Sequence, residues 1–227
     1  MMPIRDINPT HTTPIVTRAL VAINVLVFIV TFFNPRFPQI VDTWGFRPIY
    51  LYLGMRLETL FTSMFLHADI HHIFGNMLYL WIFGDNVEDA LGHEKFLVAY
   101  LGSGIVAAII QSLFTPYSIV PMIGASGAIS GVLGMYLLFY PRARIVTLLF
   151  LGYFVTTAVL PAYHYIWFWF LMQFILGSVS ILNPVPAGVA YWAHIGGFVA
   201  GLIIGRMLYN SERVRMKRME YWELLYP

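Results

Sequence analysis

The stretch MIGASGAISGVLGMY, residues 122–136, supports two interpretations. Its glycines and apolar residues are typical of a membrane helix that packs closely against a neighbour. Its central Ser126, set among small residues, is also typical of a segment that exposes a nucleophilic hydroxyl. The rest of the chain indicates how these two interpretations relate.

The composition predicts an integral membrane protein. The chain has 227 residues, of which 59% are hydrophobic and 11% are charged, with a formal net charge of +2. An average soluble domain has about 25% charged residues. No basic run lies between the apolar segments, so nucleic acid is not an expected partner. Cysteine is absent, which excludes disulfides and thiolate metal sites.

Six stretches are long and apolar enough, or nearly so, to cross a bilayer, which takes about 20 residues per helix. They are 15–33, 72–91, 96–114, 126–140, 162–182 and 192–209. The fourth is short and glycine-rich, as expected of a segment that lines a water-filled cavity. We therefore expect an all-α bundle of six transmembrane helices over 15–210, preceded by a cytoplasmic segment (1–14) without a signal-peptide pattern and followed by a charged cytoplasmic tail (211–227).

Two connections do not fit simple spans. Residues 34–71 are amphipathic and aromatic, which predicts a long first loop lying in the membrane interface. Residues 143–160 are apolar enough for a seventh span, but Arg142 and Arg144 precede them and Pro161 follows. We expect an interfacial or partly inserted connector there, with a seventh span as the alternative.

The distribution of Lys and Arg predicts the orientation, because these residues favour the cytoplasmic side. With six spans and a cytoplasmic N-terminus, ten of the 13 basic residues lie on the inner side and only Arg36, Arg47 and Arg56 lie outside. Both termini are therefore expected in the cytoplasm.

Polar residues of three separate spans occur at the same predicted depth, near the outer face. His72 and Asn76 lie in the first turns of the second span, Ser126 begins the fourth, and His194 lies in the first turn of the sixth. Interfacial side chains often contact only lipid head groups, but polar residues inside a membrane usually face a cavity or a partner. The coincidence of all four indicates a common site.

Small residues at four-residue spacing predict that the fourth and sixth spans pack together. The pairs are Gly127 and Gly131 in one span, and Gly197 and Gly201 in the other. Because Ser126 and His194 immediately precede these pairs, the packing would bring the two side chains together. Packing alone explains the glycines, but it does not explain a histidine at the same membrane depth as Ser126.

Serine beside histidine indicates nucleophilic catalysis, because a neutral imidazole can accept the proton of the hydroxyl. The oxyanion of acyl transfer needs hydrogen-bond donors, and the candidates are the Ser126 N–H, His72 and Asn76. His72 and Asn76 share one helix face at i, i+4 spacing. No acidic residue is near His194 in the sequence, which favours a Ser–His dyad over a triad.

Two other kinds of site are disfavoured. The segment GASGA (124–128) has alanine where a nucleophile elbow has glycine, and no strand–helix alternation surrounds it. The segment HADIHH (67–72) lacks the H-E-x-x-H spacing of a zinc protease. We expect neither a metal nor a cofactor.

Three motifs, in order, resemble the rhomboid family of intramembrane serine proteases. They are HADIHHIFGN (67–76), GASG (124–127) and AHIGG (193–197). The resemblance covers about 15–210 and implies a six-helix core in a minimal form of the family. It implies Ser126 as nucleophile, His194 as general base, and His72 and Asn76 as oxyanion partners.

The resemblance also implies structural roles and a substrate class. Structural support would come from Gly124, Gly127, Gly131, Gly197, Gly201 and Glu88, the last in a network near the inner end of the second span. The substrates would be single-pass transmembrane proteins, cleaved near the outer end of their helix. The aromatic run 163–170 and the loop 182–192 match the proposed substrate gate and cap of the family.

This sequence departs from the family pattern at two places. Glu58 and Thr59 stand where well-studied members have Trp-Arg in the first loop, which affects expected lipid contacts. Ser130 stands where some members have a tyrosine stacked on the catalytic histidine, so another group must hold His194.

Two alternatives to a protease remain at this point. One is a proteolytically inactive rhomboid-like protein that binds transmembrane segments. The other is a small transporter, for which we find no internal repeat. The expected location is a multi-pass position in a membrane, with a prokaryotic plasma membrane as the specific prediction; the oligomeric state is left open.

Overall fold

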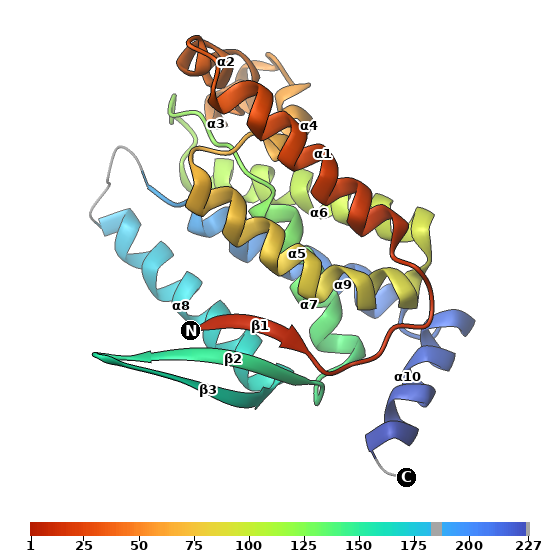
Figure 1. Cartoon of the computed structure of the whole chain (residues 1–227). Helices are drawn as coiled ribbons and strands as arrows, with labels where there is room; N and C mark the ends of the chain where they lie inside the picture. Colours follow the sequence, from red (N-terminus) through yellow and green to blue (C-terminus); the bar gives the residue numbers. More distant parts are fainter. Residues whose placement is uncertain (183–187, 226–227) are drawn as a thin grey trace.

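A computed structural model describes residues 1–182 and 188–225, and its main body is a bundle of long helices (Figure 1). The helices of the bundle correspond one by one to the predicted spans. They are α1 (Ile15–Phe32), α5 (Ile70–Leu91), α6 (His93–Phe114), α7 (Ser126–Phe139), α8 (Ala162–Leu182) and α9 (Tyr191–Leu208). The largest difference is at α6, which begins at His93 where the sequence predicts residue 96.

The bundle is that of an integral membrane protein. Within the described residues, four helices are long and apolar enough to cross a membrane: α1, α6, α8 and α9. The other two lie at the centre of the bundle. Helix α7 has only 14 residues, as its sequence predicts, and α5 carries acidic residues toward its C-terminal end. Helix α7 is mostly buried between the other helices, whereas α5 is buried mainly over its C-terminal half and exposes Phe74 and Trp81.

The first loop folds into short helices instead of one continuous element. They are α2 (Phe37–Trp44), α3 (Pro48–Leu53), α4 (Thr59–Thr62) and a 3₁₀ turn, η1 (Ser63–Phe65). Backbone hydrogen bonds join this loop to the segment before α7: Phe46 and Met122 bond each other in both directions, at 3.0 and 2.7 Å. The loop therefore holds the residues that lead into Ser126.

Helices α7 and α9 are in backbone contact along their glycines. A Cβ atom on Gly197 would overlap the carbonyl oxygen of Gly127, and one on Gly201 would overlap that of Gly131. Gly127 and Gly131 also face α6, where a Cβ atom would meet Ala107 and Ser103. The predicted small-residue packing of the fourth and sixth spans is confirmed, since no larger side chain fits at this seam.

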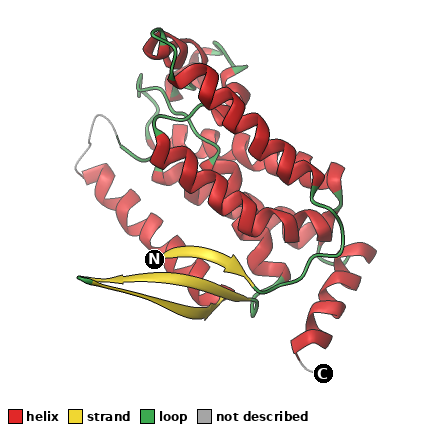
Figure 2. Cartoon of the chain, viewed as in Figure 1, coloured by secondary structure: helices red, strands yellow, loops and turns green. Residues whose placement is uncertain are grey.

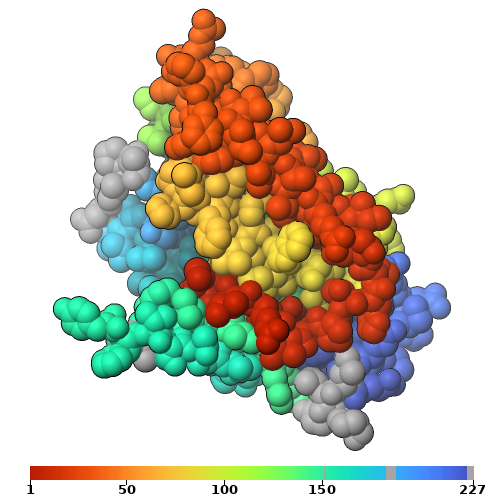
Figure 3. Space-filling model, viewed as in Figure 1, coloured from red at the N-terminus to blue at the C-terminus, as the bar shows by residue number. Residues whose placement is uncertain are grey.

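A small sheet accompanies the helices (Figure 2). Strand β1 (Met2–Asp6) pairs with β2 (Arg144–Leu151), which forms a hairpin with β3 (Phe154–Pro161). The alternative of a seventh helical span at 143–160 is thus wrong, and neither strand pairing is predicted from the sequence. The hairpin turn stands out from the rest of the surface, and the N-terminal residues lie between it and α5 (Figure 3).

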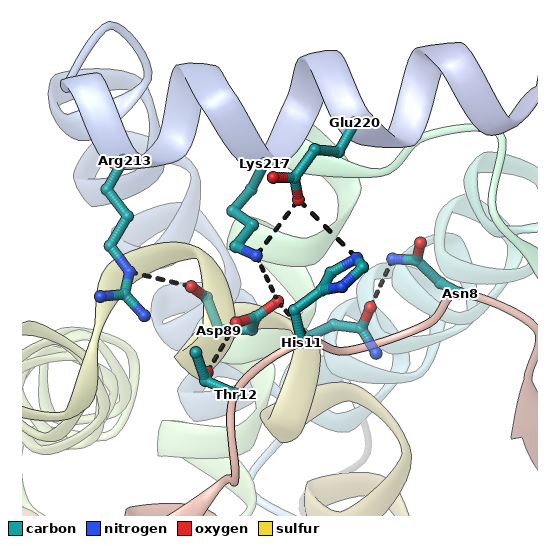
Figure 4. A network of polar contacts seen from close by, with 8 residues as sticks. Asn8, His11, Thr12, Asp89, Arg213, Lys217 and Glu220 are labelled. Atoms are coloured by element: carbon teal, nitrogen blue, oxygen red, sulfur yellow. Dashed lines mark hydrogen bonds and ion pairs between the residues drawn. The ribbon is translucent and has the colours of Figure 1, made fainter.

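The charged C-terminal segment is helical, which the sequence analysis did not predict. Helix α10 (Glu212–Leu225) packs beside the C-terminal end of α5 and the segment that precedes α1 (Figure 4). Asp89 is at the centre of the contact. Its carboxylate accepts hydrogen bonds from Thr12 Oγ1 at 2.6 Å and His11 N at 3.1 Å, and it pairs with Lys217 Nζ at 3.4 Å. Arg213 Nε donates to the Asp89 carbonyl at 3.0 Å.

Glu88 joins α5 to the start of α1. Its fully buried carboxylate accepts hydrogen bonds from Val16 N at 2.8 Å and from Thr17 N and Thr17 Oγ1, each at 2.7 Å. His93 Nδ1 lies 2.6 Å from the same carboxylate. Because the residue before α1 is Pro14, which offers no side-chain cap, Glu88 caps α1 from a neighbouring helix.

Candidate active site

Ser126 and His194 meet where α7 and α9 begin. Ser126 Oγ lies 2.8 Å from His194 Nε2, a hydrogen-bond distance. The glycine seam between the two helices brings their backbones close enough for this contact, and Gln111 Oε1 of α6 accepts a hydrogen bond from Ala193 N at 3.0 Å. The predicted proximity of the serine and the histidine is therefore present in the fold.

The second ring nitrogen of His194 is held by α8. His194 Nδ1 lies 2.8 Å from Gln173 Oε1. An amide oxygen only accepts, so Nδ1 carries the proton and donates it to Gln173. The lone pair is then on Nε2, where it accepts from the Ser126 hydroxyl. The ring also lies beside Trp169, with 6.1 Å between centroids.

His72 and Asn76 lie on the first turns of α5, beside Gly124, which is two residues before Ser126. Ala68 N donates to His72 Nδ1 at 3.3 Å, which leaves the proton of a neutral ring on Nε2. His72 Nε2 faces Gly124, because a Cβ atom built on Gly124 would lie 2.6 Å from it. Asn76 Nδ2 donates one hydrogen to the His72 carbonyl at 2.9 Å, and its second hydrogen is available for another acceptor.

Gly124 allows this arrangement for two reasons. Its φ of +121° lies in a region that favours glycine, and its missing side chain leaves room for the His72 ring. Gly124 N donates to Ser63 O at 2.9 Å, so this turn is also attached to the first loop. Any side chain at position 124 would displace His72.

The N-terminus of α7 has backbone donors to offer. The residue before the helix is Ala125, and among the described residues no side chain caps the first turn. The N–H groups of a helix's first turn have no partner within the helix, and they carry a partial positive charge. Ser126 N is one of these groups, which suits it to a developing negative charge.

The start of α5 is set by Asp69. Its Oδ1 accepts a hydrogen bond from His72 N at 2.9 Å, as an N-cap does. This bond lowers the pKa of the exposed Asp69 carboxyl. His67 packs edge-on against His72, with ring centroids 5.0 Å apart. His67 is buried, and burial lowers its pKa to about 4.

The departures from the family pattern have local explanations. Ser130 Oγ donates to the Ser126 carbonyl at 2.7 Å, within its own helix. It therefore does not contact His194. Thr59 is buried and donates to the Arg56 carbonyl at 2.6 Å, while Glu58 pairs with Arg56 at 3.3 Å. These residues stabilise the loop itself.

The predicted gate and cap are only partly described. The aromatic run 163–170 forms the first turns of α8, and Tyr165 OH lies 2.5 Å from Tyr79 OH of α5. The predicted cap at 182–192 includes 183–187, which lie outside the described residues.

Sequence reasoning missed Gln173 and Gln111, which position His194 and its helix. A signal was present for both: each is an isolated polar residue in a long apolar segment. What the sequence lacked was any indication that these side chains point toward α9.

The fold is a helical membrane bundle, and its candidate site is a hydrogen-bonded Ser–His pair at the end of the bundle where α7 and α9 begin. Comparison with known proteins identifies the family. The Rhomboid domain model matches residues 54–211. The chain therefore belongs to the rhomboid family.

Individual relatives support this assignment. The chain is 30% identical over 212 residues to "Rhomboid protein 1, mitochondrial" of Saccharomyces cerevisiae, covering 89% of this chain and 56% of that protein. It is 45% identical over 78 residues to "Rhomboid protease GluP" of Bacillus subtilis, covering 34% of this chain and 15% of that protein. It is 28% identical over 169 residues to "Rhomboid-like protein 11, chloroplastic" of Arabidopsis thaliana, covering 70% and 56%. The chain thus spans about half, or less, of the length of these relatives.

Proposed function

We propose that this protein is an intramembrane serine endopeptidase that cleaves transmembrane protein substrates with a Ser126–His194 dyad. The observation that carries the proposal is the 2.8 Å contact between Ser126 Oγ and His194 Nε2 inside a rhomboid-family membrane domain. A relative whose name includes the word protease, from Bacillus subtilis, supports the same activity.

The proposed reaction begins with transfer of the Ser126 Oγ proton to His194 Nε2. Ser126 Oγ then bonds to the carbonyl carbon of the scissile peptide, and the carbonyl oxygen becomes an oxyanion. Collapse of this intermediate breaks the C–N bond, and His194 returns the proton to the leaving amine. Water, deprotonated by His194, then hydrolyses the acyl-enzyme and regenerates Ser126.

The oxyanion would be stabilised by donors from two helices. His72 Nε2–H and the free hydrogen of Asn76 Nδ2 come from α5, and Ser126 N–H comes from the start of α7. Such preorganised donors contribute most when they are fixed before the charge develops. The bonds that hold His72 and Asn76 on their own helix supply this fixation.

An apolar groove on the outer surface of α8 is consistent with our proposal that the substrates are transmembrane proteins. The groove has a volume of about 450 Å³ and is lined by Trp167, Phe168, Phe170, Leu171 and Phe174. Aromatic and aliphatic side chains of this kind contact an apolar helix without needing charge partners. We propose that single-pass transmembrane proteins approach along α8.

The protein is a multi-pass membrane protein, and we propose that both termini lie on the cytoplasmic side. The excess of basic residues on that side supports this orientation. The specific prediction of a prokaryotic plasma membrane has no support from the relatives with printed locations, which are mitochondrial or chloroplastic.

The test is cleavage of a model single-pass membrane protein by the purified full-length chain in vesicles. We expect Ser126→Ala to abolish cleavage and to abolish labelling by a fluorophosphonate probe, while thermal stability is unchanged. Ser130→Ala is the matched control, because Ser130 lies one turn further along α7 and does not contact His194. Cleavage by Ser126→Ala at the wild-type rate would overturn the proposal.

The alternative function, a non-proteolytic protein that binds transmembrane segments, predicts a different result. Such a protein would bind the model substrate but would neither cleave it nor react with the fluorophosphonate. The hydrogen-bonded serine and histidine favour the protease, because binding alone needs no such pair.

A further inference from the structure

We propose that Gln173 is a positioning residue, through which the docking of α8 against α9 sets the tautomer and orientation of His194. This inference rests on the proposed function, because it concerns the same Ser–His pair. It goes beyond that function by assigning control of the pair to a helix that supplies neither of its members.

The contact between Gln173 and His194 is directional. Gln173 Oε1 lies 2.8 Å from His194 Nδ1, and His194 Nε2 lies 2.8 Å from Ser126 Oγ. If Gln173 were withdrawn, the neutral ring could carry its proton on either nitrogen. The tautomer with the proton on Nε2 has its lone pair on Nδ1, away from Ser126, so it is unable to accept the Ser126 proton.

Gln173 lies in a short contact region between α8 and α9. One turn further along α8, Gly177 lies against the first turn of α9: its carbonyl accepts a hydrogen bond from Trp192 Nε1 at 3.2 Å. A Cβ atom on Gly177 would lie 3.2 Å from Tyr191 Cβ, so the two helices are closely packed one turn from the Gln173–His194 contact. Trp192 is itself stacked on Phe114 of α6, with centroids 3.6 Å apart.

The first turns of α8 are anchored by the buried Tyr165 and Ile166, but most of the helix faces away from the bundle. Only 17% of its most apolar window is buried, the lowest share among the four candidate spans of the described residues. Its outward side chains are apolar, including Trp167, Phe168 and Leu171, so they provide no directional contact to the other helices. Within the C-terminal half of α8, the described polar contacts with α9 are those of Gln173 with His194 and of Gly177 with Trp192.

The first experiment compares Gln173→Leu and Gln173→Glu in cleavage assays over a range of pH. Gln173→Leu removes the acceptor, and we expect kcat to fall about 10²-fold with KM nearly unchanged. Gln173→Glu keeps an acceptor and adds a negative charge that stabilises the imidazolium. We expect it to restore most of kcat and to move the acidic limb of the pH–rate profile to higher pH. Among the described residues, the titratable groups near His194 are His72 of α5 and Tyr191 of α9, and both are present in every variant.

A merely structural Gln173 would give a different pattern. Both variants would then lose thermal stability in parallel with activity, and the pH profile of the Glu variant would match that of the wild type. That pattern would overturn the inference. Ser178→Ala, on the exposed face of α8, is the matched control and should leave activity and stability unchanged.

The second experiment tests the coupling to helix docking with a double-mutant cycle. Trp192→Phe removes the hydrogen bond to Gly177 but keeps an aromatic ring against Phe114. We expect it to lower kcat in the wild-type background and to have no further effect in Gln173→Leu. Independent, additive losses would contradict a shared action through His194.

The two proposals fail in distinguishable ways. If cleavage does not depend on Ser126, the proposed function is wrong. If cleavage depends on Ser126 but the Gln173 variants keep the wild-type kcat and pH profile, only the positioning role is wrong.

Discussion

The two ends of the helix bundle use polar side chains differently. Around Ser126, each polar group has few partners, and the contacts form a line from Ser126 to His194 to Gln173. Around Glu88 and Asp89, each carboxylate has several donors from different segments of the chain. The arrangement around Ser126 leaves lone pairs and N–H groups available for new hydrogen bonds. The arrangement around Glu88 and Asp89 engages the carboxylate oxygens in existing ones.

We infer that this difference separates side chains suited to a reaction from side chains that stabilise the fold. A catalytic group must be able to change its proton or its partner during the reaction, so it is incompletely satisfied in the resting protein. A buried carboxylate that holds helices together is stable only when its oxygen atoms are fully bonded. We therefore expect substitutions at the Ser126 end to change rates, and those at the Glu88 end to change the free energy of unfolding.

The largest effect is expected for His194→Ala. Loss of the proposed general base should reduce kcat roughly 10⁴–10⁶-fold, as for triad members in serine proteases. The thermal midpoint should change little, since the buried glycine seam beside His194 is unaltered. Cleavage assays and thermal unfolding in the same detergent test both parts. A much lower thermal midpoint for the variant would contradict the expectation that substitutions at the Ser126 end change the rate and not the stability.

Asn76→Ala should have the next largest effect on rate. Removing one oxyanion donor costs about 10²–10³-fold in kcat in other enzymes. Asn76→Asp is the sharper variant, because it keeps the size of the side chain but replaces its donor with an acceptor. Both variants should have a lower kcat. The amount of protein whose Ser126 is labelled by the fluorophosphonate should stay the same. A wild-type kcat in Asn76→Asp would exclude Asn76 as a donor.

Glu88→Ala should have the opposite pattern. It leaves Val16 N and Thr17 N without their acceptor and removes a fully buried side chain. We expect a loss of about 2–4 kcal/mol in the free energy of unfolding, with the activity of the folded fraction unchanged. Glu88→Gln should lose less, because one amide oxygen remains. Denaturant titration measures the free energy of unfolding, and cleavage assays measure kcat per folded molecule. A loss of kcat without a loss of stability would contradict a purely structural role for Glu88.

The smallest effect is expected at Asp6, at the end of β1. Tyr136 OH donates to its carboxyl at 2.7 Å and Asn86 Nδ2 at 3.0 Å, and burial raises its pKa from 3.8 to about 7. The folded chain therefore keeps this proton where the unfolded chain has lost it. Its contribution to stability is complete below about pH 4 and is lost as the pH rises toward about 7.

Asp6→Asn removes this titration. Its thermal midpoint should vary less than that of the wild type between about pH 5 and pH 7.5, with a difference of about 2–4 °C for each kcal/mol involved. Thermal unfolding at both pH values for both proteins measures the difference. Identical pH dependence in the two proteins would show that Asp6 does not titrate differently on folding.

The helices of the bundle were predictable because their signal is local. Each one is a mainly apolar stretch of a length near that needed to cross a membrane, and the predicted ends differ from the observed ones by at most three residues. The glycine pairs likewise predicted the α7–α9 contact. That contact then predicted that Ser126 and His194 would meet.

The sheet was not predictable for the complementary reason. Strand β1 pairs with β2 across a long separation in sequence, for example Asp6 with Ile145. The apolar hairpin residues carry no alternation that distinguishes strand from buried helix. The helical C-terminal segment is a similar case, because its docking depends on Asp89 and on the segment before α1.

The sequence by itself thus determined the membrane environment and the helical bundle and predicted the contact between Ser126 and His194, because composition, apolar length and small-residue spacing are properties of single segments. Only the tertiary structure decided which side chain holds the His194 ring and which side chain caps the first turn of α1 at the other end of the bundle. Gln173 contacts His194, and Glu88 caps α1, only after separate helices have packed side by side. Hydrogen bonds of this kind depend on the relative rotation of two helices, which no local pattern specifies.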